Sequence, residues 1–141
     1  MKQPLRPVWG IFFILCGVVA VALTVKAMRP KEIVPWRTDF ALASDEAKRT
    51  GKPVFAYFTA TWCGPCQTMV HTTWADKEVD AALRDYVPVK VDIDRDRDLA
   101  EKYAIRAVPT FIVLAEDGSA KRQTDGALSP AEMIAWLRGG K

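Results

Sequence analysis

Thr61-Trp62-Cys63-Gly64-Pro65-Cys66 places two cysteines three positions apart just past an apolar run. That run, residues 54–58, is rich in β-branched and aromatic residues and follows a Gly51-Lys52-Pro53 breaker, so it predicts a buried strand. Pro65 is tolerated only in the first turn of a helix, where its missing N–H would have no partner in any case. We therefore predict a strand followed by a helix, with Cys63 at or next to the helix N-cap.

The start of this helix assigns a role to each cysteine. Unpaired N–H groups and the positive end of the helix dipole stabilise a thiolate there, and the thiolate is the nucleophile in disulfide exchange. Cys66 lies about one turn further on, roughly 5 Å away between Cα atoms, which a disulfide can span. The pattern predicts Cys63 as the attacking thiol and Cys66 as the resolving thiol.

Two other roles for the cysteine pair are a structural staple and a metal site. A disulfide that closes so small a loop stabilises a fold by about 2 kcal/mol, less than a longer-range bridge would. A zinc site needs about four ligands, and the other candidates are Cys16, in an apolar run, and His71. The sequence therefore favours redox chemistry, and we expect no metal and no cofactor other than a redox-active Cys63–Cys66 disulfide.

Three further motifs, together with the cysteines, resemble the thioredoxin superfamily. They are Val89-Lys90-Val91-Asp92-Ile93-Asp94, similar to the family's central strand, Ile105-Arg106-Ala107-Val108-Pro109-Thr110, similar to its second signature, and Gly126-Ala127-Leu128-Ser129, similar to the start of its last helix. The resemblance covers residues 36–138, and Gly51 to Val54 and Trp74 to Asp76 resemble envelope members of the family. It implies a thioredoxin-like α/β fold, with a central mixed sheet and helices on both faces.

The resemblance also implies a substrate site around the two thiols. The family's signature proline has a cis peptide bond and faces the cysteines, and Pro109 stands at its position. Val108 and Pro109 would present backbone groups to an extended substrate segment, and Gly126 would leave room for it. The expected substrate-binding residues are Trp62, Gly64, Pro65, Val108, Pro109 and Gly126.

One position departs from the family pattern. Six residues before the first cysteine, thioredoxins usually carry a buried aspartate that handles the proton of the second cysteine, whereas this chain has Tyr57. A phenol rarely accepts a proton at neutral pH, so Cys66 would rely on water or another group. Lys90, which by resemblance lies near that aspartate, would lose its partner. We expect slow resolution that speeds up with pH, and a faster Tyr57→Asp variant.

Alternation and helix signals outline the rest of the domain. We expect strands at residues 87–93, 110–115 and 121–124, and helices at 40–50, 77–86, 99–103 and after Ser129. The acidic run at residues 92–98 lacks the central Gly and final Glu of an EF-hand loop, so we interpret it as a solvated turn.

Length and charge indicate one domain with an appendage. Of the 141 residues half are apolar, enough for a single core in a domain of about 100 residues. Residues 1–35 hold five Lys or Arg against one Asp or Glu, whereas residues 36–141 hold 15 against 16. The basic character thus belongs to the appendage, and we expect no nucleic-acid partner.

The appendage has the pattern of a membrane anchor. A basic lead at residues 1–7 precedes an uncharged segment at 8–25, a linker at 26–35 and the domain at 36–141. Eighteen residues form about 27 Å of helix, close to a hydrocarbon core of about 30 Å. We expect a single-pass transmembrane helix in the cytoplasmic membrane, with the domain on the outer side. The alternative is a signal peptide cleaved near Ala20-Val21-Ala22, which would release a secreted domain.

These observations combine into one functional hypothesis and two rivals. The hypothesis is a membrane-anchored thiol-disulfide oxidoreductase, and the Gly64-Pro65 pair matches reducing thioredoxins, which favours a reductase. Its expected partners are protein disulfides of the envelope and a thiol electron donor, for which a membrane-embedded protein is a candidate. The rivals are a module that binds clients without turnover, and a metallochaperone with Cys63, Cys66 and His71 as ligands.

Overall fold

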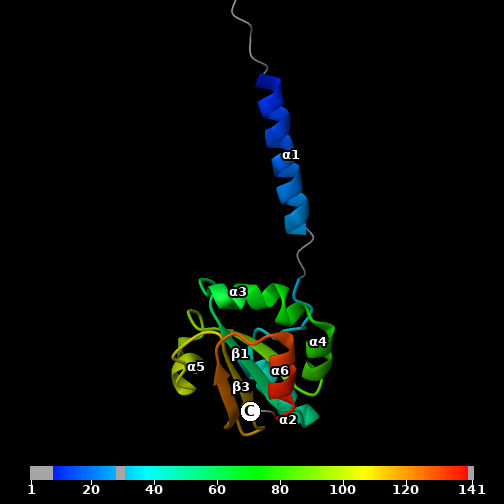
Figure 1. Cartoon of the computed structure of the whole chain (residues 1–141). Helices are drawn as coiled ribbons and strands as arrows, with labels where there is room; N and C mark the ends of the chain where they lie inside the picture. Colours follow the sequence, from blue (N-terminus) through cyan, green and yellow to red (C-terminus); the bar gives the residue numbers. More distant parts are fainter. Residues whose placement is uncertain (1–7, 28–30, 140–141) are drawn as a thin grey trace, which may run out of the picture.

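The computed structural model describes the backbone of residues 8–27 and 31–139, and the side chains of residues 10–24 and 31–139. The predicted basic lead, residues 1–7, and part of the predicted linker lie outside the described residues. In chain order the elements are α1 (Val8–Ala27), α2 (Phe40–Thr50), β1 (Val54–Thr59), α3 (Gly64–His71), the 3-10 helix η1 (Thr73–Ala75), α4 (Lys77–Leu83), β2 (Val87–Asp92), α5 (Arg97–Lys102), β3 (Thr110–Leu114), β4 (Ala120–Asp125) and α6 (Pro130–Leu137) (Figure 1).

The four strands form one mixed sheet in the order β2-β1-β3-β4. β1 runs parallel to β2 and antiparallel to β3, and β4 is antiparallel to β3. In this register Tyr57 of β1 lies between Lys90 of β2 and Phe111 of β3. The predicted α/β fold with a central mixed sheet is confirmed.

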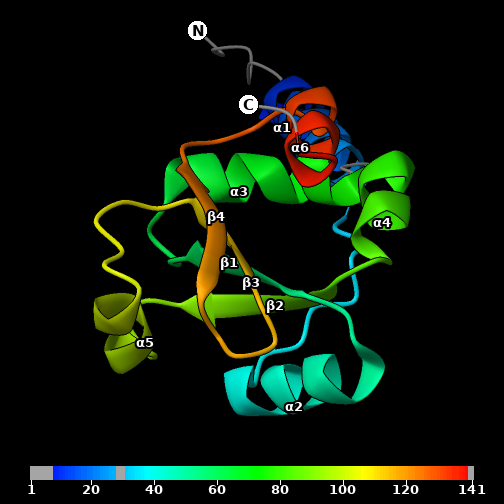
Figure 2. The ribbon, with the colours of Figure 1, turned by 90° about the horizontal axis from the view of Figure 1, so that it is seen from below.

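Helices cover both faces of the sheet (Figure 2): α2 and α5 lie on one side, and α3, α4 and α6 lie on the other. Side chains of a strand alternate between faces, so Ala56 and Phe58 pack toward α2 while Phe55 and Tyr57 pack toward α3. We call these the α2 face and the α3 face. The carboxyl end of β1 leads into α3, which places the two cysteines on the α3 face.

Local signals explain where the helices begin and end. Asp39 caps α2 by accepting from the backbone N–H of Leu42, and Gly51 ends it in the left-handed conformation that favours glycine. At α6, Ser129 and Glu132 form a capping box. α4 ends at Leu83, earlier than predicted, and Tyr86 lies in the turn that follows.

The segment before α2 packs on the domain although most of it was predicted to be linker. Val34 is 5% exposed and belongs to the core of the α3 face. The N–H of Ile33 donates to the carbonyl of Trp74, and Arg37 forms a bridge beside β2 with Val89 as its partner. The chain is therefore part of the folded domain from about Glu32 onward.

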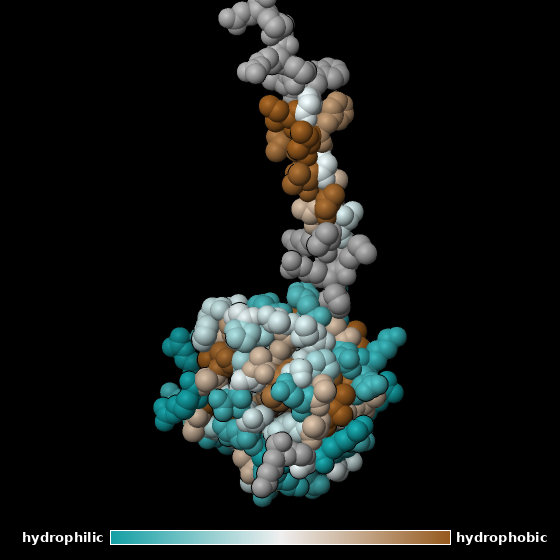
Figure 3. Space-filling view, in the orientation of Figure 1, coloured by the Kyte–Doolittle hydropathy of each residue, from teal (hydrophilic) through white to brown (hydrophobic). Residues whose placement is uncertain are grey.

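α1 covers the segment that was predicted to span a membrane. Several large apolar side chains on it are exposed, among them Ile11, Phe12 and Leu15 (Figure 3). Across residues 8–27 and 31–139, no helix combines the length and apolar character needed to cross a membrane.

Candidate active site

The two cysteines form a disulfide at the start of α3, as the sequence predicts. Cys63 is the N-cap, and its sulfur accepts from the backbone N–H of Cys66 at 3.2 Å. Pro65 occupies the first turn, and the Cα atoms of the two cysteines are 5.3 Å apart. The Cys63 sulfur therefore sits where helix N–H groups stabilise a thiolate once the bond is reduced.

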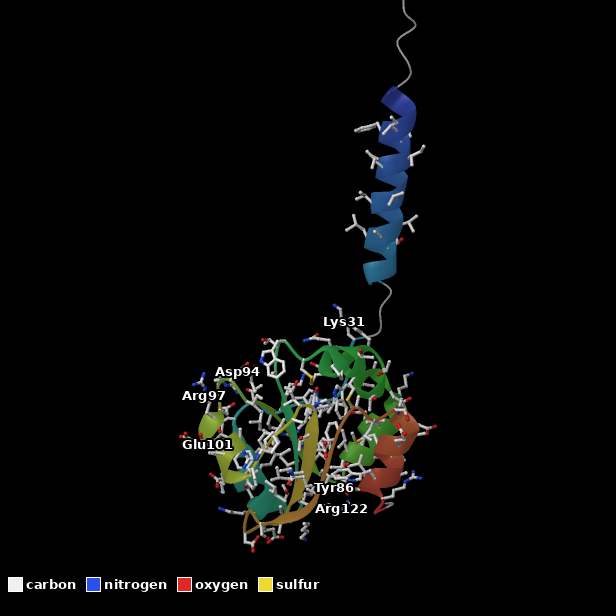
Figure 4. The ribbon with its side chains drawn as sticks, turned by 60° about the vertical axis from the view of Figure 1, so that its left-hand side comes forward. Lys31, Tyr86, Asp94, Arg97, Glu101 and Arg122 are labelled. Carbon is white, nitrogen blue, oxygen red and sulfur yellow. A yellow bond between two sulfur atoms is a disulfide. The ribbon has the colours of Figure 1, made fainter. Side chains whose placement is uncertain are left out.

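The turn between β1 and α3 holds the disulfide at the edge of the core. The backbone N–H of Cys63 donates to the carbonyl of Ala60, and the N–H of Gln67 donates to the carbonyl of Cys63. Cys63 is 3% exposed and Cys66 is 2% exposed. Figure 4 shows the disulfide as a yellow bond close to α3. In this oxidised state both sulfur-bearing residues are shielded.

Trp62, next to the first cysteine, is held in place by a contact that sequence reasoning missed. Trp62 is 67% exposed, and its Nε1–H donates to Oδ2 of Asp94 at 2.8 Å. Asp94 was assigned to a solvated turn, and the two residues are 32 positions apart. Figure 4 labels Asp94 at the end of the domain where α3 lies. The indole is thus fixed beside the disulfide with an exposed apolar surface.

The predicted proline signature has the expected local geometry. The peptide bond between Val108 and Pro109 is cis, and the carbonyl of Pro109 accepts from the N–H of Gly126 at 2.9 Å. Val108 packs against the cluster that contains both cysteines. Gly126 has a φ of 90°, a conformation that side-chain-bearing residues rarely adopt.

The structure brings some of the expected substrate-binding residues to the surface. Trp62, Gly64, Pro65 and Gly126 are exposed, Val108 is half-buried and Pro109 is buried. Contact of these residues with a substrate stays a prediction.

Tyr57 lies in the core of the α3 face, in the same cluster as Cys66, as the alternation of β1 predicts. Its ring centroid is 5.0 Å from that of Trp74 and 5.5 Å from that of Phe111. Burial raises the pKa of the Tyr57 phenol above its ordinary value. At neutral pH the Tyr57 phenol is therefore protonated, so it can donate a hydrogen bond but cannot act as a general base.

The expectation that Lys90 loses its partner is wrong. Its ammonium donates to both carboxylate oxygens of Glu32, at 2.8 and 2.7 Å, and lies 5.9 Å from the centroid of the Tyr57 ring. Glu32 also accepts from Nε1–H of Trp36 at 3.1 Å. Lys90 and Glu32 are 58 positions apart, and the packed segment before α2 supplies the carboxylate. No local pattern in the sequence indicated this pairing.

A cavity of about 260 Å³ opens between α3 and the ends of β1 and β2. Cys66, Tyr57 and Lys90 line it, and so does Asp92, the last residue of β2. Sequence reasoning placed Asp92 in the central-strand motif but gave it no role. The cavity gives solvent a path toward the resolving cysteine from the side of the sheet.

His71, the third ligand in the metallochaperone hypothesis, is at the other end of α3 from Cys63. His71 is eight positions further along the helix than Cys63, a rise of roughly 12 Å. Among the residues that the structure describes, no group of three or more His, Cys, Asp or Glu side chains could hold a metal ion.

Comparison with protein families identifies the domain. Residues 40–141 match the model of the thioredoxin-like domain. Thioredoxin Y2 of Arabidopsis thaliana chloroplasts is 38% identical over 113 residues, which cover 79% of this chain and 61% of the relative. The thioredoxin of Pseudomonas aeruginosa is 34% identical over 104 residues, covering 71% of this chain and 89% of that protein.

The solved structures agree with this match. A thioredoxin from Thermus thermophilus superimposes with a TM-score of 0.67 at 26% identity, covering 75% of this chain and 85% of that one. The chain spans about three fifths of the length of the chloroplast relatives that it matches, 61% and 59% for two of them. With its Cys-Gly-Pro-Cys disulfide, cis proline and mixed sheet, this chain belongs to the thioredoxin-like domain family.

Proposed function

We propose that the chain is a thiol-disulfide oxidoreductase that reduces disulfides in proteins by dithiol exchange. The Cys63 thiolate attacks a substrate disulfide, one substrate sulfur leaves as a thiol, and a mixed disulfide forms. The Cys66 thiolate then attacks the Cys63 sulfur, which releases the second substrate sulfur and forms the Cys63–Cys66 disulfide. Two electrons pass from the cysteine pair to the substrate.

One observation carries this proposal: the two cysteines are already joined at the N-terminus of α3. The sulfur that caps the helix is also the one beside the exposed Trp62 ring. A substrate chain can approach on that side, where Gly64 and Pro65 are exposed as well. The relatives named thioredoxin support the same chemistry.

Multiple-turnover kinetics test the proposal. The wild-type protein, supplied with dithiothreitol, should reduce insulin disulfides repeatedly. A Cys66→Ala variant, reduced beforehand and tested without dithiothreitol because that thiol would itself resolve the adduct, should stop after one mixed disulfide per molecule. A module that binds clients without turnover would be indifferent to this substitution, so equal binding of insulin with no thiol release from the wild type would favour that rival.

The reductase direction has its own measurement. Equilibration of the cysteine pair in thiol buffers of known potential gives its reduction potential. Reducing thioredoxins have reduction potentials of about −270 mV, and strong oxidants have potentials of about −120 mV. We expect a value near the reducing end, and a value near the oxidising end would reverse the assigned direction.

We also propose a location, which rests on the sequence. The uncharged residues 8–25 would hold the domain at the outer side of the cytoplasmic membrane, where envelope disulfides and a membrane-embedded electron donor are within reach. Alkaline carbonate should leave the protein in the membrane fraction, and protease added to intact spheroplasts should digest the domain. Release by carbonate, or a mature protein that starts after residue 22, would support the cleaved-signal alternative.

A further inference from the structure

The proposed function leaves one chemical step without an assigned group. Cys66 must lose its proton before it attacks the Cys63 sulfur, and an ordinary thiol has a pKa of about 8.5. The family's aspartate is replaced by Tyr57, whose phenol is buried and protonated at neutral pH. The sequence predicted slow resolution for this reason, and fast resolution near neutral pH requires a different acceptor for the Cys66 proton.

Few side chains in the cavity beside Cys66 could accept its proton. Five ionisable side chains line it: Tyr57 from β1, Cys66 from α3, Lys90 and Asp92 from β2, and Arg95 from the following turn. Lys90 and Arg95 are cations and offer no lone pair. Asp92 is therefore the one carboxylate among the described residues that opens onto the same cavity as Cys66.

Glu32 is the other carboxylate near this region, but its contacts argue against a role as the proton acceptor for Cys66. Both of its oxygens accept from the Lys90 ammonium, and Oε2 also accepts from Trp36. It does not line the cavity. Its charge offsets that of Lys90, so the ammonium does not hold Asp92 in an ion pair.

The position of Asp92 suits a proton acceptor. It pairs with Thr59 across β1 and β2, two residues beyond the pair of Tyr57 and Lys90, so all four side chains point to the α3 face. Its Oδ1 accepts from the N–H of Asp94 at 2.9 Å, which orients the carboxylate. The cavity of about 260 Å³ has room for several water molecules, each of which takes about 30 Å³ of liquid volume.

We propose that Asp92 is the general base for Cys66 and receives its proton through water in this cavity. When the proton leaves, the Cys66 sulfur uses its electron pair to bond the Cys63 sulfur. The bond between Cys63 and the substrate sulfur breaks, and the leaving thiolate takes a proton from solvent. In the reverse direction, protonated Asp92 returns the proton to Cys66 as the disulfide opens.

The test is a rapid-quench measurement of the two exchange steps. Reduced protein is mixed with a disulfide peptide, quenched with acid and alkylated, and mass spectrometry counts the mixed disulfide and the Cys63–Cys66 disulfide over time. Asp92→Asn should slow resolution about 100-fold near pH 7, within the usual range for a general base, and leave formation of the mixed disulfide almost unchanged. The deficit should shrink toward about pH 9, where Cys66 ionises unaided.

Two further variants separate this proposal from its rivals. Asp92→Glu should restore much of the rate, because it returns a carboxylate. Asp98→Asn, a matched change on exposed α5, should behave as the wild type. Asn can keep the contact to the Asp94 N–H, so the fold should survive the Asp92→Asn change.

Each remaining outcome has one meaning. Resolution in Asp92→Asn with the rate and pH profile of Asp98→Asn would overturn the role of Asp92. A loss in Glu32→Gln but not in Asp92→Asn would also overturn it and move the acceptor to Glu32. If wild-type protein forms no mixed disulfide on Cys63, the proposed function fails. If the mixed disulfide forms normally and Asp92→Asn resolves it at the wild-type rate, only the role of Asp92 fails.

Discussion

The two faces of the sheet are built by the same strands from different kinds of side chain. The core of the α2 face is mostly small and aliphatic and contains Ala43, Ala47, Val54, Ala56, Phe58, Val87, Val89, Val91, Ile112 and Leu114. The core of the α3 face contains four of the large buried aromatic rings, four sulfur-bearing residues and the wall of the cavity beside Cys66. The rings and sulfur-bearing residues are Phe55, Tyr57, Trp74, Phe111, Cys63, Cys66, Met69 and Met133.

Because of this difference, we expect one face of the sheet to contribute mainly to stability and the other to carry the redox chemistry. The buried residues of the α2 face carry no ionisable or redox-active side chain, so we expect this core to contribute to stability and not to exchange. The α3 face combines burial, which shields the disulfide, with ionisable groups that reach solvent through the cavity. Changes on the α2 face should therefore alter stability alone, and changes on the α3 face should alter exchange.

The largest effect should come from the attacking cysteine. Cys63→Ser should bring insulin reduction down to the uncatalysed rate, because the thiolate at the N-terminus of α3 is lost. Cys16→Ser, which changes the remaining cysteine of the chain, is the control and should keep full activity. Activity that persists in Cys63→Ser and disappears in Cys16→Ser would place the chemistry outside the α3 face.

The next effect is a loss of stability without a loss of exchange. Ile112 is fully buried on the α2 face, so Ile112→Ala should lower the free energy of unfolding by about 2–5 kcal/mol. Its exchange rate per folded molecule should equal that of the wild type. Urea denaturation and insulin reduction measured on the same sample check both parts. Slowed exchange in fully folded Ile112→Ala would break the separation of the two faces.

A smaller effect concerns Tyr57 in alkaline solution. Because burial raises the pKa of Tyr57, the folded protein keeps the phenol neutral where the unfolded chain, with a pKa of about 10, has begun to ionise. This contribution is fully present below about pH 10 and is lost as the pH rises further. Tyr57→Phe should flatten the alkaline decline in the free energy of unfolding.

Urea denaturation of both proteins between about pH 8 and about pH 11 makes the comparison. Phe has no ionisable group, so the two curves should diverge only above about pH 10. If the free energy of unfolding of Tyr57→Phe declines as steeply at alkaline pH as that of the wild type, groups other than Tyr57 cause the decline.

The smallest effect belongs to the surface ion pair between Arg37, which precedes α2, and Glu46 of α2. The Arg37 guanidinium donates to Glu46 and lowers the pKa of that carboxyl below its ordinary value of 4.5. Its stabilisation is present above that value and is lost as the pH falls through the lower folded pKa. Glu46→Gln should cost about 0.2–1 kcal/mol near pH 7, and nothing once the carboxyl is protonated.

Thermal unfolding from about pH 7 down to about pH 2 checks this. Insulin reduction should be unaffected, because the pair lies on the side of α2. A change in exchange with Glu46→Gln would contradict the assignment of α2 to stability alone.

Elements with local signals were predictable from the sequence. The helix start at Cys63 follows from Pro65, and the end of α2 follows from Gly51, because each residue restricts the backbone at its own position. Strand β1 was predictable because its apolar run is short and bounded by breakers. The cis bond before Pro109 followed from family resemblance rather than from any local pattern.

Contacts between distant segments were not predictable in the same way. Glu32 looked like part of a linker, and only the fold brings it to Lys90, 58 positions away. Trp62 and Asp94 meet across 32 positions, and Asp92 reaches Cys66 only through a cavity between two layers. Each of these three contacts depends on the register of β1 with β2 and on the position of α3. The periodicity of a single sequence predicts helices and strands but neither of these.

Locating the covalent intermediate on the protein tests the exchange mechanism most directly. Reduced Cys66→Ala protein is incubated with a disulfide peptide, and the adduct is mapped by mass spectrometry after proteolysis without reductant. We predict one peptide per molecule, attached to Cys63 and stable because no second thiol resolves it. An adduct on Cys16, or no adduct on Cys63 in the folded protein, would contradict the account.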